Sequence, residues 1–173
     1  MLVTISGLPG SGTTTAGRLL ADALGWEFQS SGELFRNMAG ARGVSLAEFG
    51  ALAESDERID RALDERAVAL MREAGGLVME GRLAGWMAFR NRFASMRVWL
   101  ESDSTTRARR VADRDGGSAA EQQAVMAARE ASEAQRYRDY YNIEISSREP
   151  YSLVIDSAAL APEAIVARIR EAL

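Results

Sequence analysis

Short apolar runs alternate along the chain with longer segments in which apolar residues recur every three or four positions. The runs predict strands, and the longer segments predict amphipathic helices. We expect strands at residues 2–6, 26–30, 76–80, 97–101 and 152–156, and helices at residues 13–24, 32–42, 45–54, 56–74, 104–115, 119–140 and 162–172. This alternation indicates an α/β fold with a largely parallel sheet.

Several predicted helices begin with residues that typically cap or open a helix N-terminus. In a capping box, a serine accepts a hydrogen bond from the backbone three residues on, and a glutamate at that position bonds back. The pattern occurs at Ser30…Glu33, Ser45…Glu48 and Ser118…Glu121, and Pro162 opens the last helix where its missing N–H has no cost.

Two connections between predicted strands are too long to be simple loops, because each contains helices of its own. They are residues 31–75, the first excursion, and residues 103–150, the second excursion. Long excursions at one edge of a parallel sheet usually carry function. We therefore predict one domain over residues 1–173, with a core made of residues 1–30, 76–102 and 151–173.

The segment between the first strand and the first helix reads Gly7-Leu8-Pro9-Gly10-Ser11-Gly12-Thr13-Thr14. A glycine loop in this setting surrounds phosphates with backbone N–H groups at the helix N-terminus. The segment is typical of a P-loop, except that Thr13 replaces the usual lysine. The N–H groups of Gly10 to Thr15 would face the phosphates, and the Thr14 hydroxyl would bind Mg²⁺. The alternative is an ordinary strand-to-helix turn.

Composition narrows the class of protein. The chain of 173 residues is 47% hydrophobic, which suits one domain with a sizeable core. No apolar run reaches the length of a membrane span, and no charged segment marks a signal peptide. The formal charge of −4 argues against a nucleic-acid-binding surface, and the absence of cysteine fits a reducing cytoplasm.

The absence of histidine and lysine restricts the available chemistry. All 21 cationic side chains are arginines, so imidazole acid–base catalysis and lysine Schiff bases are excluded. Arginines, carboxylates, hydroxyls and a bound metal remain. Phosphoryl transfer to a phosphate acceptor suits this set, because it depends on positioning and charge neutralisation.

Polar residues beyond the predicted strands are candidates for the site. Glu80 ends an apolar strand and is followed by Gly81 and Arg82. Ligands of parallel α/β sheets lie beyond the carboxyl ends of strands, so Glu80 could hold Mg²⁺ through water and Arg82 the acceptor's phosphate. Ser31 and Arg36 follow the second strand, where Arg36 could clamp that phosphate and Ser31 contact the sugar or base. The alternatives are an exposed Glu–Arg pair and a solvated arginine.

Charged side chains gather on two helix faces of the second excursion, with Arg129, Glu133 and Arg136 on one face and Arg110 and Arg114 on the other. Surface ion pairing is the plain alternative. However, an arginine that precedes a glutamate by four residues is the less favourable orientation. We also expect so many arginines to repel one another unless an anion binds. Gly116 and Gly117, between the two helices, would let the excursion bend.

With these residues in view, the chain resembles the archaeal-type cytidylate kinases, a branch of the P-loop nucleoside monophosphate kinases. The resemblance runs nearly end to end, and its most specific segment is Glu80 to Trp86. Threonine in place of the P-loop lysine is common in that family. The resemblance rests on Ser6 to Thr15, Ser31-Gly32, Phe35-Arg36, Ser45-Leu46, Glu48-Phe49, Ile59-Asp60, Asp64, Glu80 to Trp86, Arg129-Glu130, Ser132-Glu133, Arg136-Tyr137 and Val154 to Asp156.

The resemblance implies a three-layer P-loop fold with a five-stranded parallel sheet in the order 2-3-1-4-5. It also implies a Mg²⁺-dependent transfer of the ATP γ-phosphoryl group to CMP or dCMP by a cytoplasmic protein, which we expect to be a monomer. The first excursion would bind the nucleoside monophosphate and the second would be a lid.

The resemblance also implies roles for particular residues. ATP would be bound by Gly7, Leu8, Pro9, Gly10, Ser11, Gly12, Thr13, Thr14, Thr15, Arg110 and Arg114, and the acceptor by Ser31, Arg36, Arg82, Arg129, Glu133 and Arg136. Among these, Thr14, Arg82, Arg129 and Arg136 would be catalytic. Ala67 stands where relatives are expected to have glutamine, which leaves base selectivity open. Another monophosphate or small-metabolite kinase, and a non-catalytic nucleotide-binding protein, are the remaining alternatives.

Overall fold

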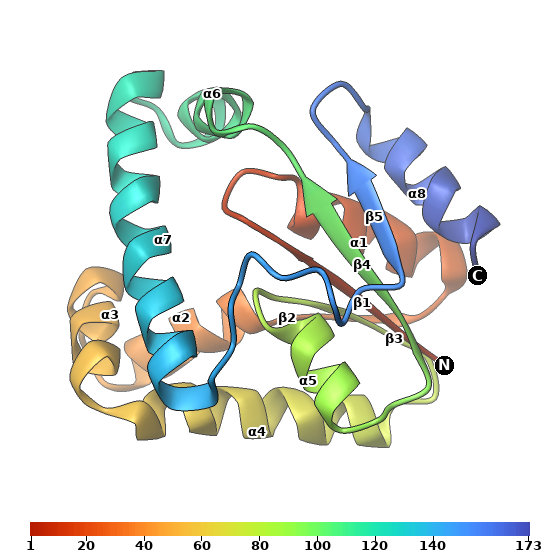
Figure 1. The fold of residues 1–173 in the computed structure, drawn as a ribbon, viewed down its shortest axis with the longest axis horizontal. Helices are drawn as coiled ribbons and strands as arrows, with labels where there is room; N and C mark the ends of the chain where they lie inside the picture. The colour runs from red at the N-terminus through yellow and green to blue at the C-terminus, as the bar shows by residue number, and fades with distance from the viewer.

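The computed structural model describes all 173 residues and contains one five-stranded parallel sheet (Figure 1). The strand order is β2-β3-β1-β4-β5, as the family resemblance implies. The strands are β1 (Leu2–Gly7), β2 (Glu27–Ser30), β3 (Leu77–Glu80), β4 (Ser95–Glu101) and β5 (Leu153–Asp156). Every neighbouring pair is parallel, so all five carboxyl ends lie at one edge of the sheet.

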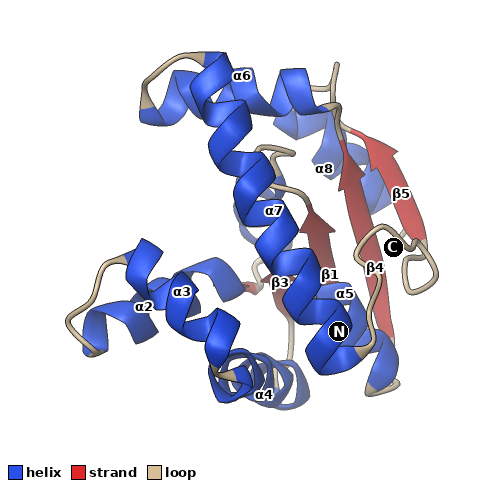
Figure 2. Ribbon diagram, turned by 60° about the vertical axis from the view of Figure 1, so that its left-hand side comes forward, coloured by secondary structure: helices blue, strands red, loops and turns tan.

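Helices connect the strands and cover both faces of the sheet (Figures 1 and 2). They are α1 (Thr13–Leu24), α2 (Ser31–Ala41), α3 (Leu46–Ser55), α4 (Glu57–Glu73), α5 (Ala84–Arg90), α6 (Ser104–Asp115), α7 (Ala119–Tyr141) and α8 (Pro162–Glu171). The sequence predicts all of them except α5. That helix is short and five of its seven residues are buried, so it shows no amphipathic period.

The sheet separates two hydrophobic clusters. Val3 and Ile5 of β1 point into a cluster formed with α1 and α8, whereas Leu2 points into a cluster formed with α4 and α5. This division follows from the alternation of side chains along a strand. Because both faces are covered, all six residues of β1 are buried, and the predicted three-layer architecture is confirmed.

Two of the three expected capping boxes are complete, at Ser45 with Glu48 and at Ser118 with Glu121. At α2, the Ser30 side chain accepts from the Glu33 backbone, but the Glu33 carboxylate does not bond back. It pairs instead with Arg18 of α1, so the prediction of a reciprocal box was wrong there. The partner of Glu33 lies on another element, which local spacing does not reveal.

The second excursion has two differently supported parts. Its carboxyl-terminal part is fixed in the core, where Tyr137 and Ile143 join the cluster of α4 and α5. Its amino-terminal part has a small cluster of its own, made of Ala108, Val111 and Met126. Helix α7 therefore extends from α6 to the vicinity of α4 and α5 (Figure 2).

None of the helices combines the length and the apolar character that a membrane span requires.

Candidate active site

The glycine loop between β1 and α1 has the backbone that its sequence predicts. Gly10 and Gly12 have φ angles of 81° and 92°, which a residue with a side chain rarely adopts. Gly12 is the N-cap of α1 and provides no side-chain cap. The first N–H groups of α1 are consequently available to an anion, and the helix dipole favours one.

A pocket of about 390 Å³ lies beside this loop. It brings together the predicted ATP-binding residues Gly10 to Thr15 with Arg110 and Arg114 of α6. Arg110 is held there by donating hydrogen bonds to the carbonyl oxygens of Ser157 and Ala158, at 2.7 and 3.1 Å. Apolar side chains complete the lining, namely Val111, Leu160, Pro162 and Ile165. The pocket therefore combines the glycine loop and two arginines with an apolar wall.

Thr13, at the position of the usual lysine, is buried and turned toward the end of β3. Its hydroxyl donates a hydrogen bond to Glu80 Oε1 at 2.9 Å, and the Ser30 hydroxyl donates to Glu80 Oε2 at 2.6 Å. Glu80 forms no direct ion pair, and the Arg82 guanidinium attracts it only from beyond ion-pair distance. The neighbouring Thr14 is exposed.

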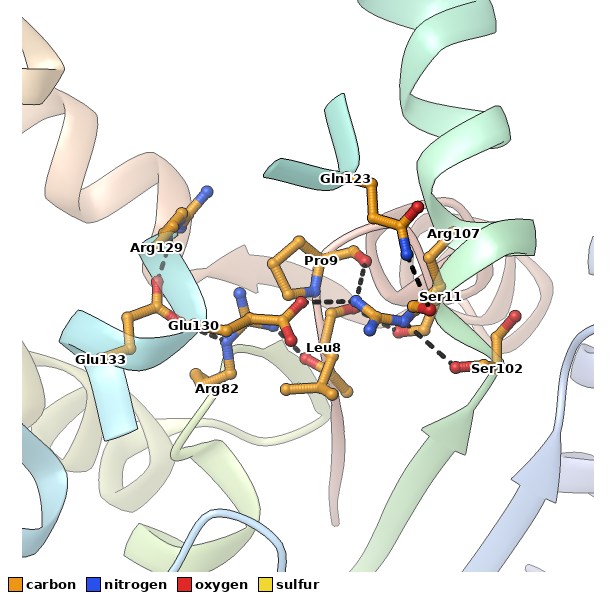
Figure 3. Close-up of polar contacts among 12 residues, drawn as sticks. Leu8, Pro9, Ser11, Arg82, Ser102, Arg107, Gln123, Arg129, Glu130 and Glu133 are labelled. Atoms are coloured by element: carbon orange, nitrogen blue, oxygen red, sulfur yellow. Dashed lines mark hydrogen bonds and ion pairs between the residues drawn. The ribbon is translucent and has the colours of Figure 1, made fainter. Parts of the chain in front are cut away.

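Arg82 joins the glycine loop to α7. Its guanidinium donates to the Gly7 carbonyl oxygen and, through Nε, to Glu133 Oε2 at 2.7 Å (Figure 3). Arg129 donates to the other oxygen of Glu133 at 2.8 Å. Burial acts to raise the pKa of the Glu133 carboxyl, but the two guanidinium groups outweigh it and hold that pKa below its ordinary value. Glu133 is therefore an anion on which two arginines converge.

A parallel connection involves Arg107, which was not predicted as a site residue. It donates to the Pro9 carbonyl oxygen at 2.9 Å and to Glu130 Oε1 at 2.5 Å (Figure 3). It also donates to the Ser102 carbonyl oxygen at 3.1 Å. The only sequence signal was indirect, since Arg107 precedes Arg110 and Arg114 at helical spacing.

Arg136 lies deeper, between α7 and α4. Its Nε is 2.9 Å from Asp60 Oδ2, and both side chains are more than nine-tenths buried. Burial raises the pKa of Asp60, and it raises the pKa of nearby Asp64 to about 7. Asp60 and Asp64 are among the residues on which the family resemblance rests, but no role was predicted for either.

These contacts correct the expected repulsion among arginines in the second excursion. Arg110 is bound by backbone carbonyls, and six other arginines of this excursion pair with carboxylates, namely Arg107, Arg114, Arg129, Arg136, Arg138 and Arg148. The density of arginines is therefore no argument by itself for a bound anion. What remains informative is their location beside the glycine loop.

The remaining predicted acceptor residues lie at the start of α2. A Cβ on Gly81 would come within 2.4 Å of Ser31 Oγ, so Ser31 packs directly against the Glu80–Arg82 segment. Arg36 is exposed and belongs to no ion pair. Ala67, by contrast, is buried in the hydrophobic cluster of α4 and α5.

Comparisons with known proteins agree with this geometry. The family model "Cytidylate kinase-like family" matches residues 2–159. A cytidylate kinase of Halobacterium salinarum is 44% identical over 95% of this chain and 85% of its own length. Cytidylate kinases of Methanococcoides burtonii and Pyrococcus abyssi are 46% and 41% identical, covering 91% and 100% of this chain and 88% and 93% of their own lengths.

Solved structures show the same fold at low sequence identity. A shikimate kinase from Bacteroides thetaiotaomicron has a TM-score of 0.66 at 16% identity, covering 99% of this chain and 97% of that one. At this identity the likeness concerns the fold alone. The sequence matches go further, and they show that the chain belongs to the cytidylate kinase-like family.

Proposed function

We propose that the protein transfers the γ-phosphoryl group of ATP to CMP or dCMP. An oxygen of the acceptor's phosphate forms a bond to the γ-phosphorus, while the bond from that phosphorus to the β–γ bridging oxygen breaks, giving ADP and CDP or dCDP. The second pKa of a nucleoside monophosphate is about 6, so its phosphate is largely ionised at neutral pH and no general base is needed. This suits a chain without histidine.

One observation carries the proposal, which is that Arg82 connects the glycine loop with the charged face of α7. Arg82 contacts Gly7 on one side and Glu133 on the other. A guanidinium between the glycine loop and α7 can neutralise charge on the transferred group. Arg129 reaches the same carboxylate, and a bound phosphate would compete with Glu133 for both guanidinium groups.

The remaining roles follow from position. We propose that Gly7 to Thr15 with Arg110 and Arg114 bind ATP, since most of these residues line one pocket. Ser31, Arg36, Arg82, Arg129, Glu133 and Arg136 would serve the acceptor, and residues 31–75 and 103–150 would be the acceptor-binding region and the lid. The catalytic groups would be Thr14, Arg82, Arg129 and Arg136.

Mg²⁺ fits the oxygen donors of the site. Thr14 presents an exposed hydroxyl, and the Glu80 carboxylate bears no guanidinium partner. Mg²⁺ usually keeps several waters and is held by one or two protein oxygens together with substrate phosphates. We propose that Thr14 binds the ion directly and Glu80 through water. When bound, the ion would neutralise charge on the phosphates.

A coupled assay of ADP formation with CMP, dCMP, UMP and AMP tests the proposal. We expect turnover with CMP or dCMP that exceeds turnover with UMP and AMP. Preference for UMP or AMP would identify a different monophosphate kinase. ATP binding without transfer to any acceptor would contradict the proposed activity and favour a non-catalytic nucleotide-binding protein.

We also expect a cytoplasmic monomer. Cell fractionation would test the location, and light scattering would test the oligomeric state.

A further inference from the structure

The carboxylate of Glu80 is held at both oxygens by hydroxyl groups from separate parts of the chain. Thr13, the first residue of α1, binds one oxygen at 2.9 Å, and Ser30, the last residue of β2, binds the other at 2.6 Å. Each oxygen retains a free lone pair, since a carboxylate oxygen accepts about two hydrogen bonds. The carboxylate is thus fixed in orientation and still able to accept from other groups.

The sheet register explains why these groups meet. Ser30 of β2 lies opposite Glu80 of β3, and Ile5 of β1 lies opposite Glu80 on the other side. The glycine loop follows β1 and returns Thr13 to the end of β3. Thr13 and Ser30 are both more than nine-tenths buried, so water does not readily replace their hydrogen bonds.

Ser30 also connects Glu80 with the first excursion. Its hydroxyl oxygen accepts a hydrogen bond from the backbone of Glu33 at 3.4 Å and caps α2. Helix α2 begins with Ser31 and carries Arg36, both proposed acceptor residues. The orientation of Glu80 is therefore connected to the start of this helix.

A lysine at position 13 would change the charge of this arrangement. Its ammonium group could reach Glu80, because the Thr13 hydroxyl is already in contact with it, and the resulting ion pair would neutralise the carboxylate. A threonine orients the same carboxylate and leaves its charge intact. A carboxylate without a direct cationic partner attracts Mg²⁺ and its bound waters more strongly than one in an ion pair.

We propose that Thr13 and Ser30 are positioning residues that aim the charged Glu80 carboxylate at the Mg²⁺ of MgATP, and that Thr13 replaces lysine for this purpose. The inference rests on the proposed metal role of Glu80 within the proposed kinase function. A lysine at this position of a P-loop is usually expected to improve the site. Here, restoring the lysine should instead weaken the effect of Mg²⁺ on ATP binding.

Calorimetric titration of ATP, with excess Mg²⁺ and in EDTA, measures this response as a ratio of two dissociation constants. We expect Thr13→Val to reduce the ratio about tenfold or more, as loss of a group orienting a metal ligand often does. Thr13 is itself a proposed ATP-binding residue, so the readout is the ratio, in which a change in affinity common to both titrations cancels. Thr13→Ser should restore the ratio, and Ser30→Ala should reduce it. Thr13→Lys should bind metal-free ATP more tightly and respond less to Mg²⁺.

Thr4→Val is the matched control, because Thr4 is a buried threonine of β1 whose hydroxyl has no hydrogen-bond partner. It should leave the Mg²⁺ response unchanged. Thermal unfolding of each variant checks that it is folded, and Ser30→Ala tests the same carboxylate if Thr13→Val does not fold.

A full Mg²⁺ response in folded Thr13→Val or Ser30→Ala would overturn the proposal, and so would a stronger response in Thr13→Lys. Since the readout is binding, it remains decisive even if the wild-type protein transfers phosphate to no nucleoside monophosphate. In that case only the proposed function fails, and the inference about Thr13 and Ser30 is still tested.

Discussion

At the scale of single residues, two arginines beside the glycine loop each join a carboxylate to a backbone carbonyl. Arg82 connects Glu133 with Gly7, and Arg107 connects Glu130 with Pro9 (Figure 3). A planar guanidinium has several donors in fixed directions, whereas an ammonium is a point charge on a flexible stem. The exclusive use of arginine therefore has a structural consequence beside the glycine loop, whatever its compositional origin.

Arg82→Ala should abolish most of the transfer while ATP still binds. Loss of one group that stabilises transition-state charge typically lowers kcat about 100- to 1000-fold. ATP affinity should change only a few-fold, since Arg82 does not line the ATP pocket. Steady-state kinetics and calorimetry measure the two effects. Arg66→Ala, at an exposed position of α4 outside every ion pair, is the control. An unchanged rate in Arg82→Ala would remove this residue from the site.

Asp64 should make stability depend on pH. Burial raises its pKa from 3.8 to about 7, so between about pH 4 and 7 the folded state holds a proton that the unfolded state has released. Stability from this group is therefore greatest at low pH and is lost as the pH rises through that window. Asp60, Arg136 and Tyr141 surround the group.

Replacing Asp64 with Asn should remove this dependence and stabilise the protein at pH 8 relative to wild type, by about 1–3 kcal/mol. Urea unfolding at pH 5 and pH 8 measures the difference. Equal pH slopes for the two proteins would show that Asp64 is ionised in the folded state throughout this range.

At the scale of elements, α7 connects the parts of the site. Its Glu130 and Glu133 reach the glycine loop through arginines, and its Arg136 pairs with Asp60 of α4. Its Tyr140 hydroxyl lies 3.0 Å from the carbonyl oxygens of both Ala53 and Glu54 in α3, which share its one proton. One long helix is thus connected to both the glycine loop and the first excursion, so under the proposed function its placement is expected to affect both ligands.

The glycine loop should not tolerate a side chain at Gly10. A Cβ there would lie 2.6 Å from the Arg107 carbonyl oxygen, on a residue whose φ is positive. We expect Gly10→Ala to destabilise the protein by at least about 1–2 kcal/mol and to weaken ATP binding. Urea unfolding and calorimetry provide the measurements.

Gly50→Ala provides the opposite control, because Gly50 lies inside α3 and a Cβ there meets nothing within 4 Å. It should stabilise the protein by about 0.5–1 kcal/mol through helix propensity. If Gly10→Ala were as stable as wild type, the loop would have to shift away from Arg107 at no cost.

At the scale of the whole molecule, the second excursion has one part that packs in the main hydrophobic core and another that packs mainly on itself. The end of α7 is packed in the core, whereas α6 and the start of α7 share only a small cluster of their own. Gly116 and Gly117 between them have φ angles of 87° and 82°. This arrangement favours a motion of α6 over the proposed ATP pocket while the rest of the fold stays in place.

ATP and CMP together should increase amide hydrogen-exchange protection in residues 104–125, with little change in the core strands. Arg110 and Arg114 would gain phosphate partners on closure, which orders the helix that carries them. Exchange measured by mass spectrometry, with either nucleotide alone for comparison, tests this. Equal exchange in the free and doubly bound protein would contradict a closing lid.

The sequence by itself determined the alternation of strands and helices, the strand order through the family resemblance, and the glycine loop with its threonine. The elements and the glycine loop are local features, because hydrophobic period, capping residues and glycine conformations act over a few neighbouring positions. The strand order is not local, and only the resemblance implied it. It also located Glu80, Arg82 and the charged face of α7, since strand ends and helix faces follow from the same periods.

Only the tertiary structure decided which charges meet. Glu33 pairs with Arg18 instead of completing its capping box, and Glu130 pairs with Arg107, which was not predicted. Thr13 contacts Glu80, which lies 67 residues further along the chain. Helix α5 also escaped prediction, because burial on nearly all sides removes the amphipathic period. Such contacts depend on the packing of segments distant in the chain, and the position of one element relative to another is not encoded in local spacing.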